Sequence, residues 1–490
     1  MKLKTILQGV SVLNKEEWAK AGDVEVTSLS YRSRMAEQGG LFCAWRGEKA
    51  DGHDFIADAV QRGAVAVVGE KSNLSLPCPY VLTPVGRAAL SVIAANFYSR
   101  PAEKLRVVGV TGTNGKTSTS LLIRRFLEMS GCKTGLLGTI EYDLGSGPIS
   151  AERTTPEGLE LQQYLRAMVD NGCRAVVMEA SSHALEQGRV AGIPYQVAVF
   201  TNLTRDHLDY HGTMEAYFAA KLKLFAGLSE GQVAVLNQDR EESKKIEDVL
   251  AKGVKVIRYG LSSSQADFVA EKINCNAEGS HFTLRSPEGS FSVKTQWIGE
   301  FNISNVLAAL AAGFGLGLPV SKMVKQAQSQ PPVPGRMERA PHAAPFSVIV
   351  DYAHTDDAVQ KALSALRPVC KGRLKVLVGC GGNRDKTKRP LMAQAACEGA
   401  DEVVFTSDNP RDEEPRQILD DMLAGVKGKK NFSVIEDRRE AIRQILNQPQ
   451  KGDVILLAGK GHETTQEIRG KKTPFSDREE ALKILQGGAA

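Results

Sequence analysis

The chain has 490 residues, of which 42% are hydrophobic and 24% charged, and this balance excludes a short peptide, a disordered chain and a fibrous protein. Its 62 lysines and arginines against 57 aspartates and glutamates leave a net charge of +5, too dilute and too unclustered to indicate a nucleic-acid partner. At ~100 to 200 residues per domain, the length predicts about three domains.

The N-terminal segment does not have the pattern of a secretory leader. Polar Gln8, Ser11 and Asn14 interrupt its apolar residues, and no small-residue cleavage site follows. The longest apolar run without a charge, 306–320, is shorter than the ~20 residues that span a bilayer, and it predicts a buried helix. The eight cysteines are scattered singly, without metal-type spacing. We therefore expect a protein of the reducing cytoplasm that does not insert into a membrane.

Two breaks divide the sequence. The first is Ser99-Arg100-Pro101, directly before an apolar run, and the second is 330–335, where three prolines and a glycine can continue neither a helix nor a strand. These breaks predict domains at 1–100, 101–334 and 335–490. No repeat of fixed period appears, which excludes solenoids and arrays.

Short apolar runs indicate that all three domains are α/β. The expected strands of the first domain lie at 41–45, 64–68 and 80–82. Those of the middle domain lie at 105–110, 175–178, 197–200, 233–236 and 254–257. Those of the last domain lie at 348–350, 374–378, 402–406, 432–435 and 454–458. Unbroken apolar strands that alternate with helical patterns are typical of a parallel sheet covered by helices on both faces.

Polar clusters follow seven of these expected strands. Open α/β sheets bind ligands in the crevice beyond the carboxyl ends of their strands, so these clusters are candidate site segments. They lie at 111–117, 179–183, 201–207, 351–354, 379–386, 407–411 and 459–463.

The run Thr-Gly-Thr-Asn-Gly-Lys-Thr at 111–117 lies between an apolar strand and an expected helix at 118–129. Such a turn forms a phosphate cradle, in which backbone N–H groups and the helix N-terminus attract phosphate oxygens. Lys116 adds a positive charge, and the hydroxyl of Thr117 would bind Mg²⁺. The usual pattern has glycine where this chain has Val110, so the match is a variant. The alternative is a glycine-rich turn without a ligand.

Two further residues are candidate metal ligands, because phosphoryl transfer from ATP needs carboxylates or imidazoles that hold a metal. Glu179 ends an apolar strand and is the best first ligand by position, although it could instead cap the following helix. His207 could serve a second metal, and its alternative is a hydrogen-bonded loop histidine.

These residues resemble the Mur ligases, ATP-dependent amide-forming enzymes of bacterial cell-wall synthesis, and the similarity runs nearly end to end. The run at 111–117 is similar to the nucleotide loop of the family. Motifs similar to the members that add the third peptide residue lie at 154–156, 179–183 with Gln187 and Arg189, 201–211, 351–355, 408–411 and 459–463. The resemblance implies a small N-terminal α/β domain that binds the UDP-muramyl substrate, a central P-loop-type ATPase domain with a parallel sheet, and a C-terminal Rossmann-like α/β domain that binds the amino acid.

The implied reaction joins two small molecules and needs ATP and Mg²⁺. The D-glutamyl carboxylate of UDP-N-acetylmuramoyl-L-alanyl-D-glutamate would attack the γ-phosphate of ATP, giving an acyl phosphate and ADP, and the amine of meso-2,6-diaminopimelate would then displace phosphate. The acyl phosphate must be kept from water, so we expect the domains to close around it. We expect the enzyme to be a monomer.

The resemblance carries site residues over by motif. Lys221 matches the family lysine that CO₂ converts into a carbamate, N6-carboxylysine, whose carboxylate-like group can approach Mg²⁺; read without the resemblance, it would be an exposed helix lysine. The implied catalytic residues are Lys116, Glu179, His207 and Lys221, and the implied metal ligands are Thr117, Glu179, His207 and Lys221. The implied ATP-binding residues are Gly112, Thr113, Asn114, Gly115, Lys116, Thr117, Ser118, Asn302, Asn305, Arg336 and Asp351.

Two groups of residues are implied to bind the UDP-muramyl dipeptide. The group in the first domain, which would meet the uridine diphosphate, is Tyr31, Ser33, Glu48, Lys49 and Ala50. The group in the central domain, which would hold the muramoyl peptide, is Arg153, Thr154, Thr155, Ser181, Gln187 and Arg189. For Tyr31 and Ser33 the alternative is a polar loop without a ligand.

The choice of amino acid rests on the run Asp408-Asn409-Pro410-Arg411. Diaminopimelate differs from lysine by a second carboxylate, which a guanidinium can hold through two parallel hydrogen bonds. Family members that add lysine lack this arginine, so the resemblance implies the diaminopimelate type. Arg384, Gly459 and Glu463 would complete the pocket, with Glu463 facing the distal ammonium. The alternative is that Arg411 pairs locally with Glu413 or Glu414.

The chain departs from the family pattern at two positions. Asp356 stands where a proline is common, and we expect it to alter only the entry of a helix, where aspartate is also favourable. Asn383 replaces a usual aspartate near Arg384.

Three other functions compete with this hypothesis. The chain could be a ligase for another carboxylate, such as a folylpolyglutamate or D-alanyl-D-alanine-adding enzyme, although Arg411 and the run Ser181-Ser182-His183 argue against it. It could be a P-loop motor or switch, but 6% aromatic residues and near-balanced charge do not support nucleic-acid binding. It could also be a nucleotide-binding regulator that has lost catalysis.

Overall fold

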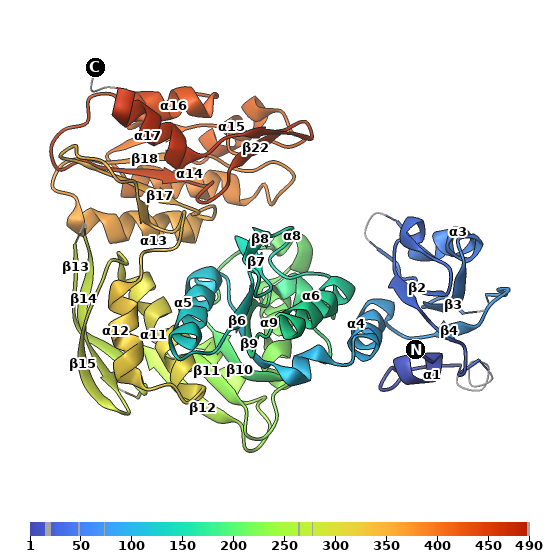
Figure 1. Cartoon of the computed structure of the whole chain (residues 1–490). Coiled ribbons are helices and arrows are strands. Elements are labelled where there is room, and N and C mark those ends of the chain that lie inside the picture. Colours follow the sequence, from blue (N-terminus) through green and yellow to red (C-terminus); the bar gives the residue numbers. More distant parts are fainter. Residues whose placement is uncertain (15–20, 48–49, 73, 263–264, 277, 488–490) are drawn as a thin grey trace.

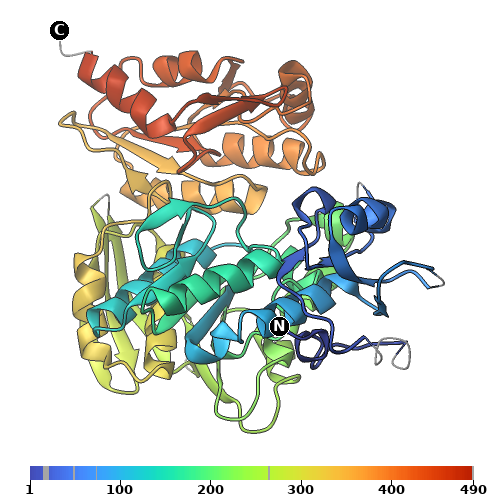
Figure 2. The same cartoon turned by 45° about the vertical axis from the view of Figure 1, so that its right-hand side comes forward.

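The computed structural model describes residues 1–14, 21–47, 50–72, 74–262, 265–276 and 278–487. It has three α/β domains in chain order, and the predicted fold class is confirmed. In Figure 1 the central domain lies between the N-terminal domain at the right and the C-terminal domain at the top, and Figure 2 shows the same arrangement turned by 45°. Glu48 and Lys49, which were predicted to contact uridine diphosphate, lie outside the described residues.

The N-terminal domain is built on a parallel sheet with the strand order β1-β2-β3-β4. The strands are β1 (Ser28–Ser30), β2 (Gly40–Cys43), β3 (Ala64–Gly69) and β4 (Tyr80–Leu82). The helices are α1 (Leu3–Ile6), α3 (Ile56–Gln61) and α4 (Gly86–Phe97), with 3-10 turns at Ser33–Met35 and Gly52–Phe55. One face of the sheet packs on α1 and α4, and the other face packs on α3.

The central sheet has the strand order β15-β14-β13-β12-β11-β10-β5-β9-β6-β7-β8 and is parallel from β13 to β6. The strands are β5 (Arg106–Thr111), β6 (Thr134–Leu137), β7 (Glu141–Asp143), β8 (Pro148–Ser150), β9 (Ala175–Glu179), β10 (Tyr195–Phe200), β11 (Val233–Asn237), β12 (Lys255–Gly260), β13 (Phe268–Asn276), β14 (Gly279–Ser286) and β15 (Gly289–Thr295). The helices are α5 (Lys116–Met129), α6 (Gly158–Asp170), α7 (Ser182–Glu186), α8 (Leu208–His211), α9 (Met214–Ala226), α10 (Glu242–Glu247), α11 (Glu300–Gly315) and α12 (Val320–Ser329), with a 3-10 turn at Pro101–Lys104. The apolar strands bury both faces, against α5, α11 and α12 on one side and α6 and α9 on the other.

The antiparallel extension β13-β14-β15 was not among the predicted strands. In β14 and β15 buried and exposed residues tend to alternate, because one face of this hairpin packs on α11 and α12 while the other faces solvent. The search for unbroken apolar runs therefore missed these strands, whereas a period-2 pattern around the turn between Ser286 and Gly289 would have indicated them.

The C-terminal sheet has the strand order β16-β17-β21-β18-β19-β20 and is parallel except for β16. The strands are β16 (Glu338–Arg339), β17 (Ser347–Asp351), β18 (Leu374–Val378), β19 (Glu402–Phe405), β20 (Phe432–Val434) and β21 (Val454–Ala458), with a separate hairpin of β22 (Thr465–Ile468) and β23 (Lys471–Pro474). The helices are α13 (Asp356–Leu366), α14 (Lys388–Gly399), α15 (Pro415–Leu423), α16 (Arg438–Ile445) and α17 (Asp477–Gly487), with a 3-10 turn at Arg367–Val369. Helices α13, α14 and α15 cover one face, and α16 and α17 cover the other.

Direct contacts join the domains. Helix α4 packs on α6, and Arg87 Nε lies 3.1 Å from Glu157 Oε2 across this joint. Between the central and C-terminal domains, Arg205 Nη2 donates to Thr387 Oγ1 at 2.7 Å.

The predicted apolar helix at 306–320 corresponds to α11 and the start of α12, and most of it is buried in the central core. Within the part of the chain that the structure describes, no helix is both long and apolar enough for a transmembrane span.

Candidate active site

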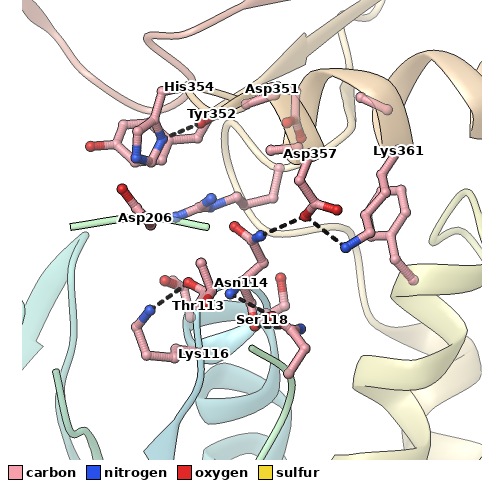
Figure 3. Close-up of a pocket in the computed structure, with 18 of the residues that line it drawn as sticks. Thr113, Asn114, Lys116, Ser118, Asp206, Asp351, Tyr352, His354, Asp357 and Lys361 are labelled. Carbon is pink, nitrogen blue, oxygen red and sulfur yellow. Dashed lines mark hydrogen bonds and ion pairs between the residues drawn. The ribbon is translucent and has the colours of Figure 1, made fainter. Parts of the chain in front are cut away.

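A cavity of about 940 Å³ lies where the carboxyl ends of the central and C-terminal strands face each other. Its wall contains the glycine-rich loop between β5 and α5 and also the loops that follow β17, β18, β19 and β21. Figure 3 shows Asn114 and Lys116 from the central domain opposite Asp351, His354 and Asp357 from the C-terminal domain. Asn114 Nδ2 lies 3.4 Å from Asp357 Oδ2, so the two domains touch across this cavity.

The loop before α5 is shaped for an anion. Gly112 and Gly115 have φ of 147° and 86°, a region that residues with a side chain rarely adopt. A Cβ on Gly112 would lie 1.9 Å from Thr201 Oγ1, and one on Gly115 would lie 2.2 Å from Asn305 Oδ1. Gly115 is also the N-cap of α5 and offers no capping side chain, so the first N–H groups of the helix are open to an acceptor. This cradle fits a phosphate group.

Two lysines, one from α5 and one from α9, converge on this loop. Lys116 Nζ donates to Gly112 O at 3.0 Å and to Thr113 O at 2.8 Å, and Lys221 Nζ donates to the same Gly112 oxygen at 2.9 Å. Lys221 is 1% exposed and lies over the ring of Tyr217, whose hydroxyl is 3.1 Å from Thr113 Oγ1. Lys221 is therefore not an exposed helix lysine. Burial, and next the charge of Lys116, hold the pKa of Lys221 well below its usual value.

Glu179 does not cap the helix that follows it. The N-cap of α7 is Ser181, whose side chain accepts from the N–H of Ala184. Glu179 Oε1 accepts from the N–H of Thr139 and Oε2 from its hydroxyl, both at 2.9 Å, and Thr139 Oγ1 lies 3.1 Å from Thr154 Oγ1. The carboxylate lines the cavity, so the helix-cap interpretation is wrong.

His207 lines the same cavity in a left-handed conformation with φ of 54°. Its Nε2 lies 3.5 Å from Asp206 Oδ2, and its side chain is 43% exposed. Partial burial in the cavity wall lowers the pKa of the His207 imidazole, although Asp206 opposes this shift. The ring can therefore present a neutral nitrogen to the cavity. Among the described residues, no group of three or more His, Cys, Asp and Glu side chains is arranged to hold a metal ion by itself.

The predicted adenosine side is also in the cavity wall. Asn302 Nδ2 donates to Ile298 O at 2.9 Å, and Asn305 Nδ2 donates to Asn302 Oδ1 at 3.2 Å. Arg336 lies over the ring of Tyr352, 4.5 Å from its centroid. Asp351 accepts from the N–H of Met337, and burial raises the pKa of its carboxyl. The predicted ATP residues that line the cavity are Thr113, Asn114, Gly115, Lys116, Thr117, Ser118, Asn302, Asn305, Arg336 and Asp351, whereas Gly112 is not part of the lining.

Among the residues predicted to bind the UDP-muramyl substrate, Tyr31 lies at the joint between the N-terminal and central domains. Tyr31 OH donates to Glu160 Oε1 at 2.7 Å, and its ring lies 5.1 Å from that of Trp45. Ser33 begins a 3-10 turn and Ala50 precedes another, and neither lines the cavity. Of the predicted peptide-binding residues, Thr154 lines the cavity, whereas Arg153, Thr155, Ser181, Gln187 and Arg189 do not.

A buried carboxylate at this joint gathers three arginines. Glu157 is 5% exposed and lies 3.1 Å from Arg87, 2.8 Å from Arg153 and 3.2 Å from Arg189. Arg189 Nε also donates to Gln187 Oε1 at 2.8 Å. Arg87 and Glu157 were not predicted, because their pairing joins two domains and leaves no local pattern.

Arg411 and its neighbours form the C-terminal side of the cavity. Arg411 Nη1 donates to Gly382 O at 2.7 Å, and among the described residues the carboxylate nearest to the guanidinium is that of Glu467, at 4.0 Å. Glu413 instead pairs with Arg389, and Glu414 pairs with Arg469. The interpretation that Arg411 pairs locally with these glutamates is therefore wrong. Arg384, Asp408, Asn409, Gly459 and Glu463 also line the cavity, and Pro410 does not.

The two departures from the family pattern have clear places in the structure. Asp356 is the first residue of α13, behind an N-cap at Thr355, so it does lie at a helix entry. Asn383 has φ of 53°, which asparagine tolerates well, and its Oδ1 accepts from the N–H of Asp412. It thus connects the loop of Arg384 to the loop of Arg411.

Comparison with known proteins covers all three domains. Residues 25–99, 110–313 and 335–461 match the families described as "Mur ligase family, catalytic domain", "Mur ligase middle domain" and "Mur ligase, glutamate ligase domain". The chain is 46% identical over 98% of both chains to a protein of Geobacillus thermodenitrificans, and 44% identical over 98% of both to one of Listeria monocytogenes. Both are named UDP-N-acetylmuramoyl-L-alanyl-D-glutamate--2,6-diaminopimelate ligase. A solved structure of that title is 34% identical, with a TM-score of 0.72 over 100% of this chain and 99% of the other.

Proposed function

Because the chain belongs to the Mur ligase family, we propose that it joins meso-2,6-diaminopimelate to UDP-N-acetylmuramoyl-L-alanyl-D-glutamate, with hydrolysis of ATP to ADP and phosphate, in peptidoglycan precursor synthesis. One observation carries this proposal. The glycine-rich loop and the Arg411 loop, which belong to different domains, line a single cavity. A carboxylate activated at the first loop can therefore meet an amine held at the second without leaving that cavity.

Activation takes place on the central-domain side. The N–H groups at the start of α5 and the ammonium of Lys116 would bind the phosphates of ATP, once Lys116 leaves the two carbonyls that it contacts. Thr117, Glu179, His207 and a carbamylated Lys221 would hold Mg²⁺, which when bound supplies positive charge that offsets the charge of the phosphates. The D-glutamyl carboxylate then attacks the γ-phosphorus, and ADP leaves.

The carbamate on Lys221 is supported by the surroundings of its amine. Only a neutral amine attacks CO₂; a C–N bond forms, one proton leaves, and an anionic carbamate remains. Burial beside Lys116 lowers the pKa of Lys221 and so favours the neutral amine. The product would also place an anion beside the ammonium of Lys116, and this attraction favours the carbamate.

The amino acid is held on the C-terminal side. The guanidinium of Arg411 has no carboxylate within 3.5 Å among the described residues, so its fork can receive the distal carboxylate of diaminopimelate through two hydrogen bonds. Glu463, which also lines the cavity, would face the distal ammonium. The reacting amine then attacks the acyl phosphate, an amide bond forms, and phosphate leaves.

We assign the UDP-muramyl substrate to residues 1–100 together with the central-domain joint, ATP to 101–334 and the amino acid to 335–490. The arginines gathered at Glu157 suit an anionic, peptide-bearing substrate at that joint. We further propose a cytoplasmic monomer. All eight cysteines are free, and one chain supplies both sides of the cavity.

A product assay by mass tests this function. The chain is incubated with ATP, Mg²⁺ and the UDP-muramyl dipeptide, and with meso-diaminopimelate and L-lysine in competition. We expect the diaminopimelate tripeptide, with ADP formed only when both substrates are present. Equal use of L-lysine would refute the specificity, and ADP formation without any amide would refute the ligase function.

A further inference from the structure

A fully buried lysine lies directly beneath the proposed amino-acid pocket. Lys460, two residues after strand β21, is 0% exposed. Its Nζ donates to Glu463 Oε2 at 3.0 Å and to Asn409 Oδ1 at 3.1 Å. Both partners line the cavity, but Lys460 itself is not part of the lining. Its hydrogen bonds therefore connect it to the cavity through these two side chains.

The contacts of Asn409 and Glu463 form a closed network. Asn409 Nδ2 donates to Glu463 Oε2 at 2.7 Å, so two donors hold the same carboxylate oxygen. Asn409 Oδ1 accepts from Lys460 and also from the N–H of Glu467, at 3.0 Å. The amide of Asn409 is thus fixed in one orientation, with its NH₂ group towards Glu463. None of these bonds uses Glu463 Oε1, which stays available to the cavity.

A buried ammonium needs compensating partners. Here both hydrogen-bond partners are residues of the proposed pocket, and so is Asp408, whose carboxyl also interacts with the charge of Lys460. If the lysine only filled space, an apolar side chain would do so at lower cost. Hydrogen bonds to charged groups are the stronger ones, and they hold a carboxylate in one geometry. The position of Lys460 therefore accounts for a Glu463 carboxylate that is already oriented before the amino acid binds.

We propose that Lys460 is a positioning residue for amino-acid selection, which holds Glu463 so that its free oxygen accepts the distal ammonium of the diamino acid. This inference rests on the proposed function and adds a residue to it. Arg411 binds the distal carboxylate, and Glu463, held by Lys460 and Asn409, binds the neighbouring ammonium.

Substrate analogues separate this role from a general structural one. L-2-Aminopimelate keeps the reacting amine and the distal carboxylate of diaminopimelate but lacks the distal ammonium. With Lys460→Met we expect KM for diaminopimelate to rise about tenfold, as for loss of a hydrogen bond to a charged group. KM for aminopimelate should stay within about twofold, because that substrate has no distal ammonium to lose. The preference for diaminopimelate over aminopimelate therefore becomes smaller.

An equal rise of both KM values would show a merely structural role and overturn the inference. Unchanged KM values for both substrates would also overturn it.

Lys375→Met is the matched control. Lys375 has a side chain that is 8% exposed and pairs with Glu402 at 3.1 Å, but it lies near the amino end of β18, away from the cavity. We expect it to leave the ratio of the two KM values unchanged.

Two further variants complete the test, namely Glu463→Gln and the double variant Lys460→Met/Glu463→Gln. They give a second comparison of the two KM values if Lys460→Met alone does not fold. If Lys460 acts through Glu463, the double variant shows the same preference as Glu463→Gln. A further loss of preference in the double variant would overturn the inference. A wild-type chain that forms no amide at all would instead refute the proposed function, so the two failures are distinct.

Discussion

Lys116 and Lys221 donate to one carbonyl oxygen, that of Gly112, at 3.0 and 2.9 Å. Their ammonium nitrogens therefore lie within about 6 Å of each other in a buried place, where like charges repel strongly. Burial and this repulsion favour loss of a proton, and burial lowers the pKa of both groups. The same geometry that attracts phosphate thus prepares one of the two lysines for reaction with CO₂.

Lys221→Ala should remove the carbamate and most of the turnover. We expect bicarbonate to raise the turnover of CO₂-depleted wild type and to leave the variant unchanged. A carbamate signal from ¹³C-bicarbonate, seen by NMR in wild type, should be missing from the variant. Lys223→Ala is the control, since Lys223 lies on the same helix but is 47% exposed and pairs with Glu186. Full activity of Lys221→Ala would contradict the assignment.

Gly115→Ala should weaken ATP binding by about tenfold or more, which corresponds to about 1.4 kcal/mol. The new Cβ would lie 2.2 Å from Asn305 Oδ1, so either the loop or Asn305 must move. The control is Gly131→Ala, at φ of 79° beyond the end of α5, where no atom lies within 4 Å of the new Cβ. Both variants bear the cost of a left-handed alanine, and only the first has the clash. Calorimetric titration with ATP measures the difference; equal affinities in the two variants would show that the cradle tolerates a side chain.

Arg411→Lys keeps the charge but loses the planar fork. Affinity for diaminopimelate should fall by about 1 to 3 kcal/mol, the range for a hydrogen bond to a charged group, while KM for ATP stays unchanged. Arg469→Lys provides a control, because its guanidinium pairs with Glu414 and its side chain is 76% exposed. Steady-state kinetics with each substrate varied in turn make the comparison. An unchanged KM for diaminopimelate would argue against Arg411 as the carboxylate clamp.

His354 should make the fold sensitive to acid. Burial lowers the pKa of this histidine to about 4, and its Nδ1–H donates to Tyr352 O at 2.9 Å. In the unfolded chain His354 takes up a proton near pH 6.5, and in the folded chain it does so only near pH 4. Its contribution to the free energy of unfolding is therefore fully present above pH 6.5 and is lost as the pH falls towards 4.

The expected contribution of His354 to this loss is about 1 to 3 kcal/mol. Urea unfolding of His354→Gln at several pH values should show a shallower decline than wild type. The control His281→Gln, at an exposed histidine, should follow wild type. If the free energy of unfolding fell equally steeply with pH in wild type and His354→Gln, His354 would not be the cause of the acid sensitivity.

Much of the fold could be predicted from local pattern. The runs at 105–110, 374–378 and 454–458 correspond to strands β5, β18 and β21 because a strand buried on both faces must be apolar throughout. The hairpin of β14 and β15 was missed because it exposes one face and therefore has a different period.

The sequence by itself determined the α/β class, the glycine-rich loop and the motif of Arg411, because each depends on residues that are close neighbours along the chain. Tertiary structure alone decided that Lys221 meets Gly112, 109 residues away, that Glu179 bonds to Thr139 rather than capping α7, and that Lys460 is buried under Asn409. Residues that are close along the chain have restricted relative positions, so their pattern predicts local structure. Contacts between distant segments depend on how sheets and domains pack, and the periodicity of hydrophobic residues does not specify that packing.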